Sequence, residues 1–338
     1  MTKTTLEITE QEVEQLIEKL ALLKKEIHKK IVGQEDTIEQ LLITFMAGGH
    51  ALLEGVPGLA KTLMIRTLAQ AIELPFRRIQ FTPDLMPTDI TGTEILQEDQ
   101  STGERVFKFN KGPIFANIIL ADEINRTPPK TQSALLEAMQ EFEVTYGGKT
   151  YELDRPFFIL ATQNPIEQAG TFPLPEAQLD RFLLFIQIGY PTEQDELGIL
   201  TDTTGTKKVK IEPVMTGEEI RKVQELVREV TTEQNLIAFV NLIVRATRPD
   251  STSVNYIKEW VRWGAGPRAG QAMILTAKAR ALLQGRFAVT LEDIKAVAYP
   301  VLRHRILMNF KAEAQGITSD QATTELLKQI SLPKSKLE

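Results

Sequence analysis

The sequence predicts an α/β fold, a parallel-sheet domain followed by an all-helical domain, from two observations. Short apolar runs alternate with amphipathic helical segments up to Pro191, which is typical of parallel strands with helices on both faces of the sheet. Beyond residues 191–205 only helical periodicity remains, and no convincing strand is found. The expected organisation is an N-terminal helix over 1–30, the α/β domain over 31–195 and the helical domain over 196–338.

Composition narrows the class of protein. The 338 residues are 42% hydrophobic and 25% charged, as in soluble globular proteins of about two domains. The absence of cysteine excludes disulfides and thiolate zinc sites. No apolar run of about 18 residues could span a membrane, and the polar N-terminus lacks the core of a signal peptide, so a cytoplasmic location is expected. A net charge of −6 gives the chain no overall positive charge with which to bind nucleic acid, although a local basic patch remains an alternative.

The first helices are predicted from apolar spacing. Residues 9–28 place apolar side chains three and four positions apart, as on one face of a helix. Thr9 and Glu12 fit a capping box at its start. A second helix follows the segment Ile31–Gln34 and runs through Phe45, where two glycines end it.

One stretch, ALLEGVPGLAKTL, predicts a phosphate-binding loop. An apolar strand turns through a glycine-containing loop into a periodic helix, which is the context this loop needs. Gly55 and Gly58 let the backbone direct N–H groups toward one point, where the helix adds its positive end. Lys61 would reach the β- and γ-phosphates, and the Thr62 hydroxyl would ligate Mg²⁺. Ala60 replaces the second glycine of the strict pattern by one methyl, so we expect the loop to persist. The expected phosphate-binding residues are Gly55, Val56, Pro57, Gly58, Leu59, Ala60, Lys61, Thr62 and Leu63.

The segment 82–112 interrupts the alternation of strands and helices. Two alternating runs, at 94–96 and 105–109, flank a polar tip, Glu98–Glu104. We predict an inserted β-hairpin here, with an irregular surface loop as the alternative. A second hairpin is predicted over 143–153, where strand-like runs surround Gly-Gly.

The remaining elements follow from apolar runs and caps. Buried strands are expected at 74–81, 118–123, 157–161 and 183–188. A helix starting at Pro128-Pro129 separates two of them. In the second domain we expect a helix capped by Thr216 and Glu219, and further helices at Leu236–Ala246, Ala269–Leu283 and Leu291–His304.

Polar side chains end two of these strands. Asp122 would hold Mg²⁺ through water, and Glu123 would polarise a water for attack on a γ-phosphate. An adjacent Asp-Glu pair is a weak signal alone, but this pair follows the phosphate loop by about sixty residues on a separate apolar strand. Asn164, at the tip of the next strand, would orient the water, although it could simply form a turn before Pro165.

Local chemistry does not assign the two arginines that stand out. Arg181, in the run LDRF, is equally consistent with a surface salt bridge. Arg268, in GAGPRAG, stands at a predicted helix start, where a cation is unfavourable. That placement indicates an anion nearby.

With these motifs in place, the sequence resembles the AAA+ ATPases and, among them, the MoxR family. The resemblance covers most of the chain, from Ile31 to His304, and the run 120–141 is highly specific. The segments that carry it are GVPGLAKT at 55–62, LADEINRTPPKTQSALLEAMQE at 120–141, ATQNP at 161–165, LPEAQLDRF at 174–182 and GAGPRAG at 264–270.

The resemblance implies an AAA+ αβα domain with a helical lid, and it assigns roles. Lys61 and Thr62 belong to Walker A, Asp122 and Glu123 to Walker B, and Asn164 to sensor 1. Arg181 is similar to the arginine finger and Arg268 to the sensor 2 arginine. The segment 82–112 is similar to a helix-2 insert, and 143–153 to a pre-sensor hairpin. The segment that packs on adenine would be Ile31, Val32, Gly33 and Gln34.

The resemblance also implies partners. MoxR-type proteins form hexameric, chaperone-like rings that act on protein clients, commonly with a partner bearing a von Willebrand factor A domain. The expected function is therefore ATP hydrolysis with Mg²⁺, coupled to remodelling or activation of a client. Two alternatives stay open: a DNA-associated motor, which the acidic pI disfavours, and a nucleotide-gated scaffold with negligible turnover.

Overall fold

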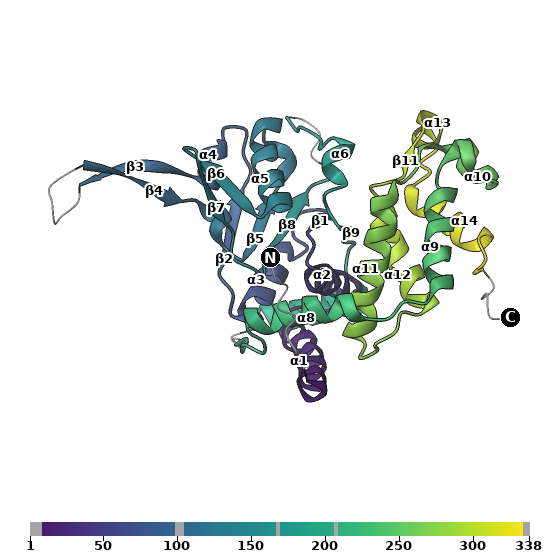
Figure 1. Cartoon of the computed structure of the whole chain (residues 1–338), viewed down its shortest axis with the longest axis horizontal. Helices are drawn as coiled ribbons and strands as arrows, with labels where there is room; N and C mark the ends of the chain where they lie inside the picture. Colours follow the sequence, from purple (N-terminus) through teal and green to yellow (C-terminus); the bar gives the residue numbers. More distant parts are fainter. Residues whose placement is uncertain (1–8, 99–104, 167–169, 206–208, 334–338) are drawn as a thin grey trace.

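A five-stranded parallel sheet in the order β2-β5-β8-β1-β9 forms the centre of the computed structural model, which describes residues 9–98, 105–166, 170–205 and 209–333 (Figure 1). This arrangement confirms the α/β fold class. The strands are β1 (Ala51–Glu54), β2 (Phe76–Gln80), β5 (Ile118–Asp122), β8 (Phe158–Gln163) and β9 (Leu184–Gln187).

The strand registers determine where polar side chains gather. Ile118–Asp122 is buried along its whole length, as expected for a central strand covered on both faces. In the parallel pairs, Gln80 stands opposite Asp122, and Glu54 stands opposite Gln163. Parallel strands place all their carboxyl ends at one edge. Residues that end β1, β5 and β8 therefore meet there, and residues that precede β1 and β9 meet at the opposite, amino edge.

Helices cover both faces of the sheet and create two apolar cores. One core joins the sheet to the first three helices and to the lid, and the other joins it to α4, α5 and the β6–β7 hairpin. Thr9 and Glu12 form the predicted capping box on α1. The helices concerned are α1 (Glu10–His28), α2 (Glu35–Met46), α3 (Lys61–Ile72), α4 (Pro87–Thr91), α5 (Pro129–Glu141) and α6 (Glu176–Leu179), with short 3-10 turns at Pro113–Phe115 and Ile124–Arg126.

Both predicted hairpins are present. β3 (Gly92–Glu98) pairs with β4 (Arg105–Lys111), and β6 (Glu143–Tyr146) pairs with β7 (Lys149–Glu152). The β3–β4 hairpin extends away from the sheet (Figure 1). The predicted tip of this hairpin, Glu98–Glu104, lies outside the described residues, except for Glu98. At its base the hairpins touch, because the Phe109 ring stacks on Tyr151 with centroids 4.4 Å apart.

The lid is helical apart from one short strand pair. Val261–Trp263 (β10) pairs antiparallel with Leu307–Met308 (β11), so the expectation of no strand beyond residue 191 is wrong here. Two or three residues are too short to show a period in sequence. The helices of this part are α7 (Glu193–Thr203), α8 (Gly217–Glu229), α9 (Gln234–Ala246), α10 (Asn255–Trp260), α11 (Pro267–Leu283), α12 (Leu291–Leu302), α13 (Phe310–Ala314) and α14 (Ser319–Gln329), with a 3-10 turn at Pro249–Ser251.

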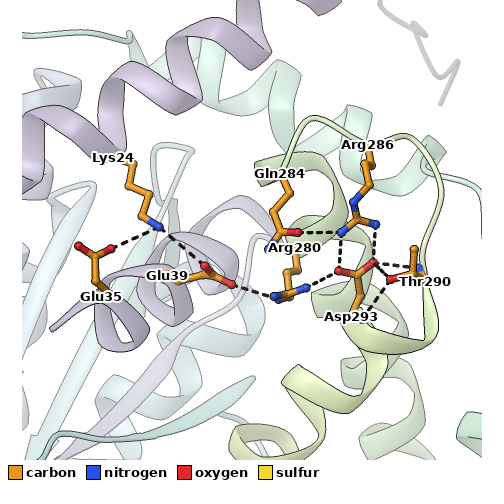
Figure 2. Close-up of polar contacts among 8 residues, drawn as sticks. All are labelled: Lys24, Glu35, Glu39, Arg280, Gln284, Arg286, Thr290 and Asp293. Atoms are coloured by element: carbon orange, nitrogen blue, oxygen red, sulfur yellow. Dashed lines mark hydrogen bonds and ion pairs between the residues drawn. The ribbon is translucent and has the colours of Figure 1, made fainter.

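A chain of charged side chains joins the lid to the first helices (Figure 2). Glu39 on α2 accepts a hydrogen bond from Arg280 on α11 at 3.0 Å, and Arg280 donates to Asp293 on α12 at 2.6 Å. Arg286 donates to both oxygens of Asp293 at 2.7 Å. Burial opposes ionisation of Asp293, but the hydrogen bonds from Arg286, Thr290 and Arg280 outweigh it and lower its pKa to about 2. The lid is thus attached through ionised groups.

No helix within the described ranges has the length and apolar character needed to cross a bilayer.

Candidate nucleotide site

The phosphate loop has the backbone conformation of a tight strand–loop–helix turn. Gly58 has φ +90°, which favours glycine. A Cβ on Gly55 would lie 2.0 Å from Cγ2 of Ile188, so this glycine is required by packing. Ala60 caps α3 at φ 55° and ψ 20°, a left-handed conformation that costs a non-glycine residue about 1 kcal/mol. Lys61 Nζ donates to the Gly55 carbonyl at 2.7 Å, which closes the loop.

A cavity of about 450 Å³ lies at the carboxyl edge of the sheet. It brings together residues from the loop, from β2, from the end of β5 and from the end of β8. The strand order explains this meeting, because β1, β5 and β8 end side by side. The lining residues are Pro57, Gly58, Leu59, Ala60, Lys61, Thr62, Leu63, Arg78, Asp122, Glu123 and Asn164.

Asp122 is nearly buried, with 8% of the residue exposed. Its Oδ2 accepts from Arg78 at 3.0 Å (Nε) and 2.6 Å (Nη2). Its Oδ1 accepts from the Thr162 hydroxyl at 2.6 Å. The guanidinium balances a carboxylate charge that would be costly to bury alone. A cation bound at this edge would meet the same need, so Asp122 fits a Mg²⁺ site.

Two hydrogen-bond donors fix the orientation of the Glu123 side chain. Gln80 Nε2 donates to Glu123 Oε2 at 2.8 Å, and Arg126 Nη1 donates to the same oxygen at 3.0 Å. The Glu123 backbone has φ 58°, and its N–H donates to the Thr162 hydroxyl at 2.9 Å. A left-handed glutamate at the end of a strand is a strained position of the kind that collects at functional sites.

Of two further predictions for this site, Asn164 lies in the cavity and the segment Ile31–Gln34 does not. Asn164 lines the cavity, is 5% exposed, and accepts from the Ile166 N–H at 3.1 Å, so it also forms the turn considered as its alternative. The segment Ile31–Gln34 does not line the cavity. It packs on the chain after β9: Gln34 Nε2 donates to the Gly189 carbonyl at 3.1 Å, and a Cβ on Gly33 would lie 2.6 Å from the Asp195 carboxyl.

The two arginines, Arg181 and Arg268, lie together in a second cavity. This cavity has a volume of about 320 Å³ and is lined also by Asp180, Arg228 and Arg305. It adjoins Gly49, His50 and Leu183, which precede β1 and β9, so it lies at the amino edge of the sheet. Arg268 forms an ion pair with Asp180 at 3.6 Å, and Arg181 forms no ion pair with any residue that the structure describes. One chain therefore does not bring these arginines to Lys61.

Three consecutive residues at the end of α12 clamp the segment that carries Arg181. Arg303 donates to the Phe185 carbonyl at 2.6 Å, and His304 Nε2 lies 3.1 Å from the Phe182 carbonyl. Arg305, which is 8% exposed, donates to Asp180 Oδ1 at 2.7 Å and to the Phe182 carbonyl at 2.9 Å. Since Asp180 also pairs with Arg268, this clamp connects the two arginines of the second cavity.

Sequence reasoning did not assign roles to several residues that contact the predicted site. In sequence, Arg78 and Gln80 indicate only strand positions. Knowledge of the strand order could have suggested a role in the site, because β2 borders β5 and the two residues point to the same face of the sheet. Thr162 lies inside the motif ATQNP and could have been found there. Arg305 carries no local signal, since it reaches Asp180 only through tertiary packing.

Comparison with known proteins agrees with this arrangement. The family "ATPase family associated with various cellular activities (AAA)" matches residues 50–184, and the AAA lid domain matches residues 256–326. The crystal structure of a candidate ATPase from Cytophaga hutchinsonii superposes with a TM-score of 0.89 at 43% identity, covering 96% of this chain and 98% of that chain.

Curated relatives give the family. Chaperone MoxR1 of Mycobacterium tuberculosis is 42% identical over 310 residues, which covers 91% of this chain and 81% of the relative. The uncharacterized protein YeaC of Bacillus subtilis is 42% identical over 308 residues, covering 91% and 92%. Protein MoxR of Methylorubrum extorquens is 29% identical over 305 residues, covering 85% and 87%. With this identity over nearly the whole chain, the chain belongs to the MoxR family of AAA+ ATPases.

Proposed function

We propose that this protein hydrolyses ATP to ADP and phosphate and uses the energy to remodel or activate a protein client. The observation that carries the proposal is a cavity at the carboxyl edge, where Lys61, Thr62, Asp122, Glu123 and Asn164 converge. In it, Lys61 and the loop amides bind the phosphates. Glu123 accepts a proton from the attacking water, and Asn164 orients that water.

Mg²⁺ would be held by Thr62 and, through water, by Asp122, and it would neutralise charge on the phosphates. No described cluster of three or more acidic, histidine or cysteine side chains could hold a metal ion. The remaining ligands would therefore be phosphate oxygens and water, as is usual for Mg²⁺. Arg78, which donates to Asp122 at 3.0 Å and 2.6 Å, would then share this carboxylate with a water bound to the ion.

Glu123 needs a change of partners before it can act as a base. Its Oε2 accepts from both Gln80 and Arg126 in this structure, so two donors occupy the oxygen that would take a proton from water. Release of Oε2 by these two donors when ATP binds would leave this oxygen open to the attacking water. This arrangement supports a resting state that limits idle hydrolysis.

Arg181 and Arg268 are proposed to act on the nucleotide of a neighbouring subunit. Both line the amino-edge cavity, whereas the phosphate loop lies at the carboxyl edge. A head-to-tail contact between subunits joins unlike faces and closes into a ring when the rotation allows it. We propose a homo-oligomeric, hexameric ring in which each interface completes one ATP site.

The client-related part of the proposal comes from family membership. A relative at 42% identity is named a chaperone, which supports a chaperone-like role. We propose that a partner bearing a von Willebrand factor A domain connects the ring to its protein client, and that the protein works in the cytoplasm.

Steady-state phosphate release tests the activity, and subunit mixing tests the arrangement. A Lys61→Ala subunit keeps Arg181, and an Arg181→Ala subunit keeps a whole phosphate loop. Each variant alone should be nearly inactive, and their mixture should recover part of the hydrolysis.

The matched control replaces the first partner by a Lys61→Ala, Arg181→Ala double variant, which offers no arginine and should give no recovery. Mixing with Arg268→Ala tests the second arginine in the same way. A mixture that co-assembles without recovery would show that Arg181 does not act across the interface.

A further inference from the structure

An apolar groove of about 840 Å³ runs along the lid between α9 and α11. Its lining combines aliphatic side chains from both helices with Gly270. Pro267 is exposed and Ile274 and Leu275 are half-buried, whereas Val240 and Val244 are buried at the base of the groove. Ile237 on its edge is 39% exposed. The other apolar residues are Val240, Val244, Pro267, Ile274 and Leu275. Exposed apolar surface of this kind indicates a binding partner.

The rim of the groove is cationic. Arg228, Arg245, Arg248 and Lys278 line it, and no acidic residue of the described part of the chain does. Arg248 Nε donates to the Ala265 carbonyl at 3.1 Å, and Lys278 donates to the Arg228 carbonyl at 2.7 Å. Among the described residues neither side chain forms an ion pair, although the charge of Glu229 acts on Lys278. A complementary occupant is therefore apolar with acidic side chains beside it.

One described helix has this pattern and no partner for it. Glu193, Glu196, Leu197 and Leu200 follow the spacing of one face of α7. Leu197 is 61% exposed and Leu200 is 60% exposed, and both glutamates are exposed. Neither glutamate forms an ion pair with a described residue. The opposite face packs inward, since a Cβ on Gly198 would lie 3.1 Å from Val32.

We propose that the groove of one subunit receives the Glu193–Leu200 face of α7 from the neighbouring subunit. The two leucines would bury against the floor, and the two glutamates would meet the cationic rim. This inference rests on the proposed ring and names the surfaces that join it.

The fold explains why the two surfaces meet only between copies. Helix α7 follows β9 and lies beside Ile31–Gln34 at the carboxyl edge. The groove shares Arg228, Gln271 and Leu275 with the cavity that holds Arg268 at the amino edge. In one chain, the two surfaces lie at opposite edges of the sheet. In a head-to-tail pair, docking of α7 would bring the arginine cavity toward the neighbour's nucleotide.

A charge-swap experiment tests the pairing. The groove variant carries Arg245→Glu with Lys278→Glu, and the helix variant carries Glu193→Lys with Glu196→Lys. Assembly is measured by sedimentation velocity with ATP and Mg²⁺ in the Glu123→Gln background, which slows hydrolysis. Each variant should assemble at least about tenfold more weakly than the background protein, and the four changes together should restore assembly to within about threefold.

The matched control carries Arg262→Glu with Glu18→Lys, which reverses two exposed charges outside both surfaces, and should assemble normally. Calorimetry of ATP binding to each dissociated variant checks that the chain is folded. Normal assembly of the groove variant would overturn this docking while the ring stands. A background protein that stays monomeric with ATP would overturn the ring and this inference together.

A crosslink gives a second measurement, because the chain contains no cysteine. Leu197→Cys with Ile237→Cys should form disulfide-linked oligomers on mild oxidation, since the two positions would face each other across the interface. Leu197→Cys with Arg262→Cys is the control and should stay monomeric under denaturing electrophoresis. Equal crosslinking of the two pairs would overturn the proposed docking.

Discussion

The two edges of the central sheet differ in how the chain builds them. At the carboxyl edge, loop and strand ends place Lys61, Asp122 and Glu123 around one cavity by local geometry. At the amino edge, Arg181 sits in a segment held by side chains from the lid, more than one hundred residues later in sequence. In the proposed mechanism, the first edge carries the reacting groups and the second supplies charges to the nucleotide of a neighbouring subunit. If the ring is as proposed, each chain provides two different half-sites.

The largest effect is expected at the carboxyl edge. Glu123→Gln keeps the shape of the side chain and removes the carboxylate that we propose accepts the proton. Turnover should fall about 100-fold or more, whereas ATP affinity should stay within about threefold. Phosphate release and calorimetry measure the two quantities. Near-normal hydrolysis would place the base elsewhere and remove the contrast between the edges.

The second prediction concerns the clamp at the amino edge. Arg305→Lys keeps the charge but loses the fork that reaches Asp180 and the Phe182 carbonyl together. Hydrolysis should fall about tenfold with unchanged ATP affinity. In mixtures, this variant should fail to rescue Arg181→Ala, yet it should itself be rescued by Lys61→Ala.

Arg66→Lys, on α3 outside both cavities, is the matched control and should behave as wild type. If Arg305→Lys rescues Arg181→Ala fully, the clamp has no influence on the arginine it holds.

The third prediction concerns the pH dependence of stability, to which two buried histidines at the amino edge contribute. Burial lowers the pKa of His50, which precedes β1, to about 4, and burial with the charge of Arg305 lowers that of His304 well below its usual range. The unfolded chain binds protons at these residues below about pH 6.5. Their contribution to stability is therefore complete above pH 6.5 and is lost as the pH falls toward 4. Between pH 7.5 and 5.5 the loss for His50 should be about 1 kcal/mol.

Urea unfolding of the wild type and of His50→Gln at both pH values measures this loss. The variant should show a smaller decrease in the free energy of unfolding over that interval. The lowered pKa of Asp293 affects stability in a separate window, from about pH 4 down to 2. An equal decrease in wild type and variant would show that His50 does not titrate with unfolding.

The smallest effect on hydrolysis is expected for the inserted hairpin. Replacing residues 98–104 by Asn-Gly keeps the base of the hairpin, where Phe109 stacks on Tyr151. Basal ATPase and ring formation should be unchanged within about twofold, because none of the proposed catalytic side chains belongs to this segment. Stimulation by a partner should be lost, since we propose that the tip transmits the ATP state. Collapse of basal hydrolysis with intact coupling would make the insert part of the active site.

The sequence reveals the candidate residues of the carboxyl edge more readily than those of the amino edge, for a physical reason. Lys61, Asp122 and Glu123 are recognisable because their chemistry depends on neighbours within a few residues and on strand ends. The roles of Arg78, Gln80 and Arg305 depend on which strands and helices become adjacent, which no local pattern encodes. The short β10–β11 pair was missed because two residues, Leu307 and Met308, cannot display a period. The hairpins and most helices were predicted, because glycine turns, caps and apolar spacing are local.

The charged chain of Figure 2 has a mechanical consequence. The lid is fastened to the first helices through Glu39 and Arg280, and to the start of β9 through Arg303 and Arg305. Rotation of the lid against the sheet would break both attachments at once. We therefore expect each subunit to behave as a stiff link, with its hinges located at the joints between subunits. ATP hydrolysis would then change the orientation of neighbouring subunits in the proposed ring, rather than the shape of each subunit.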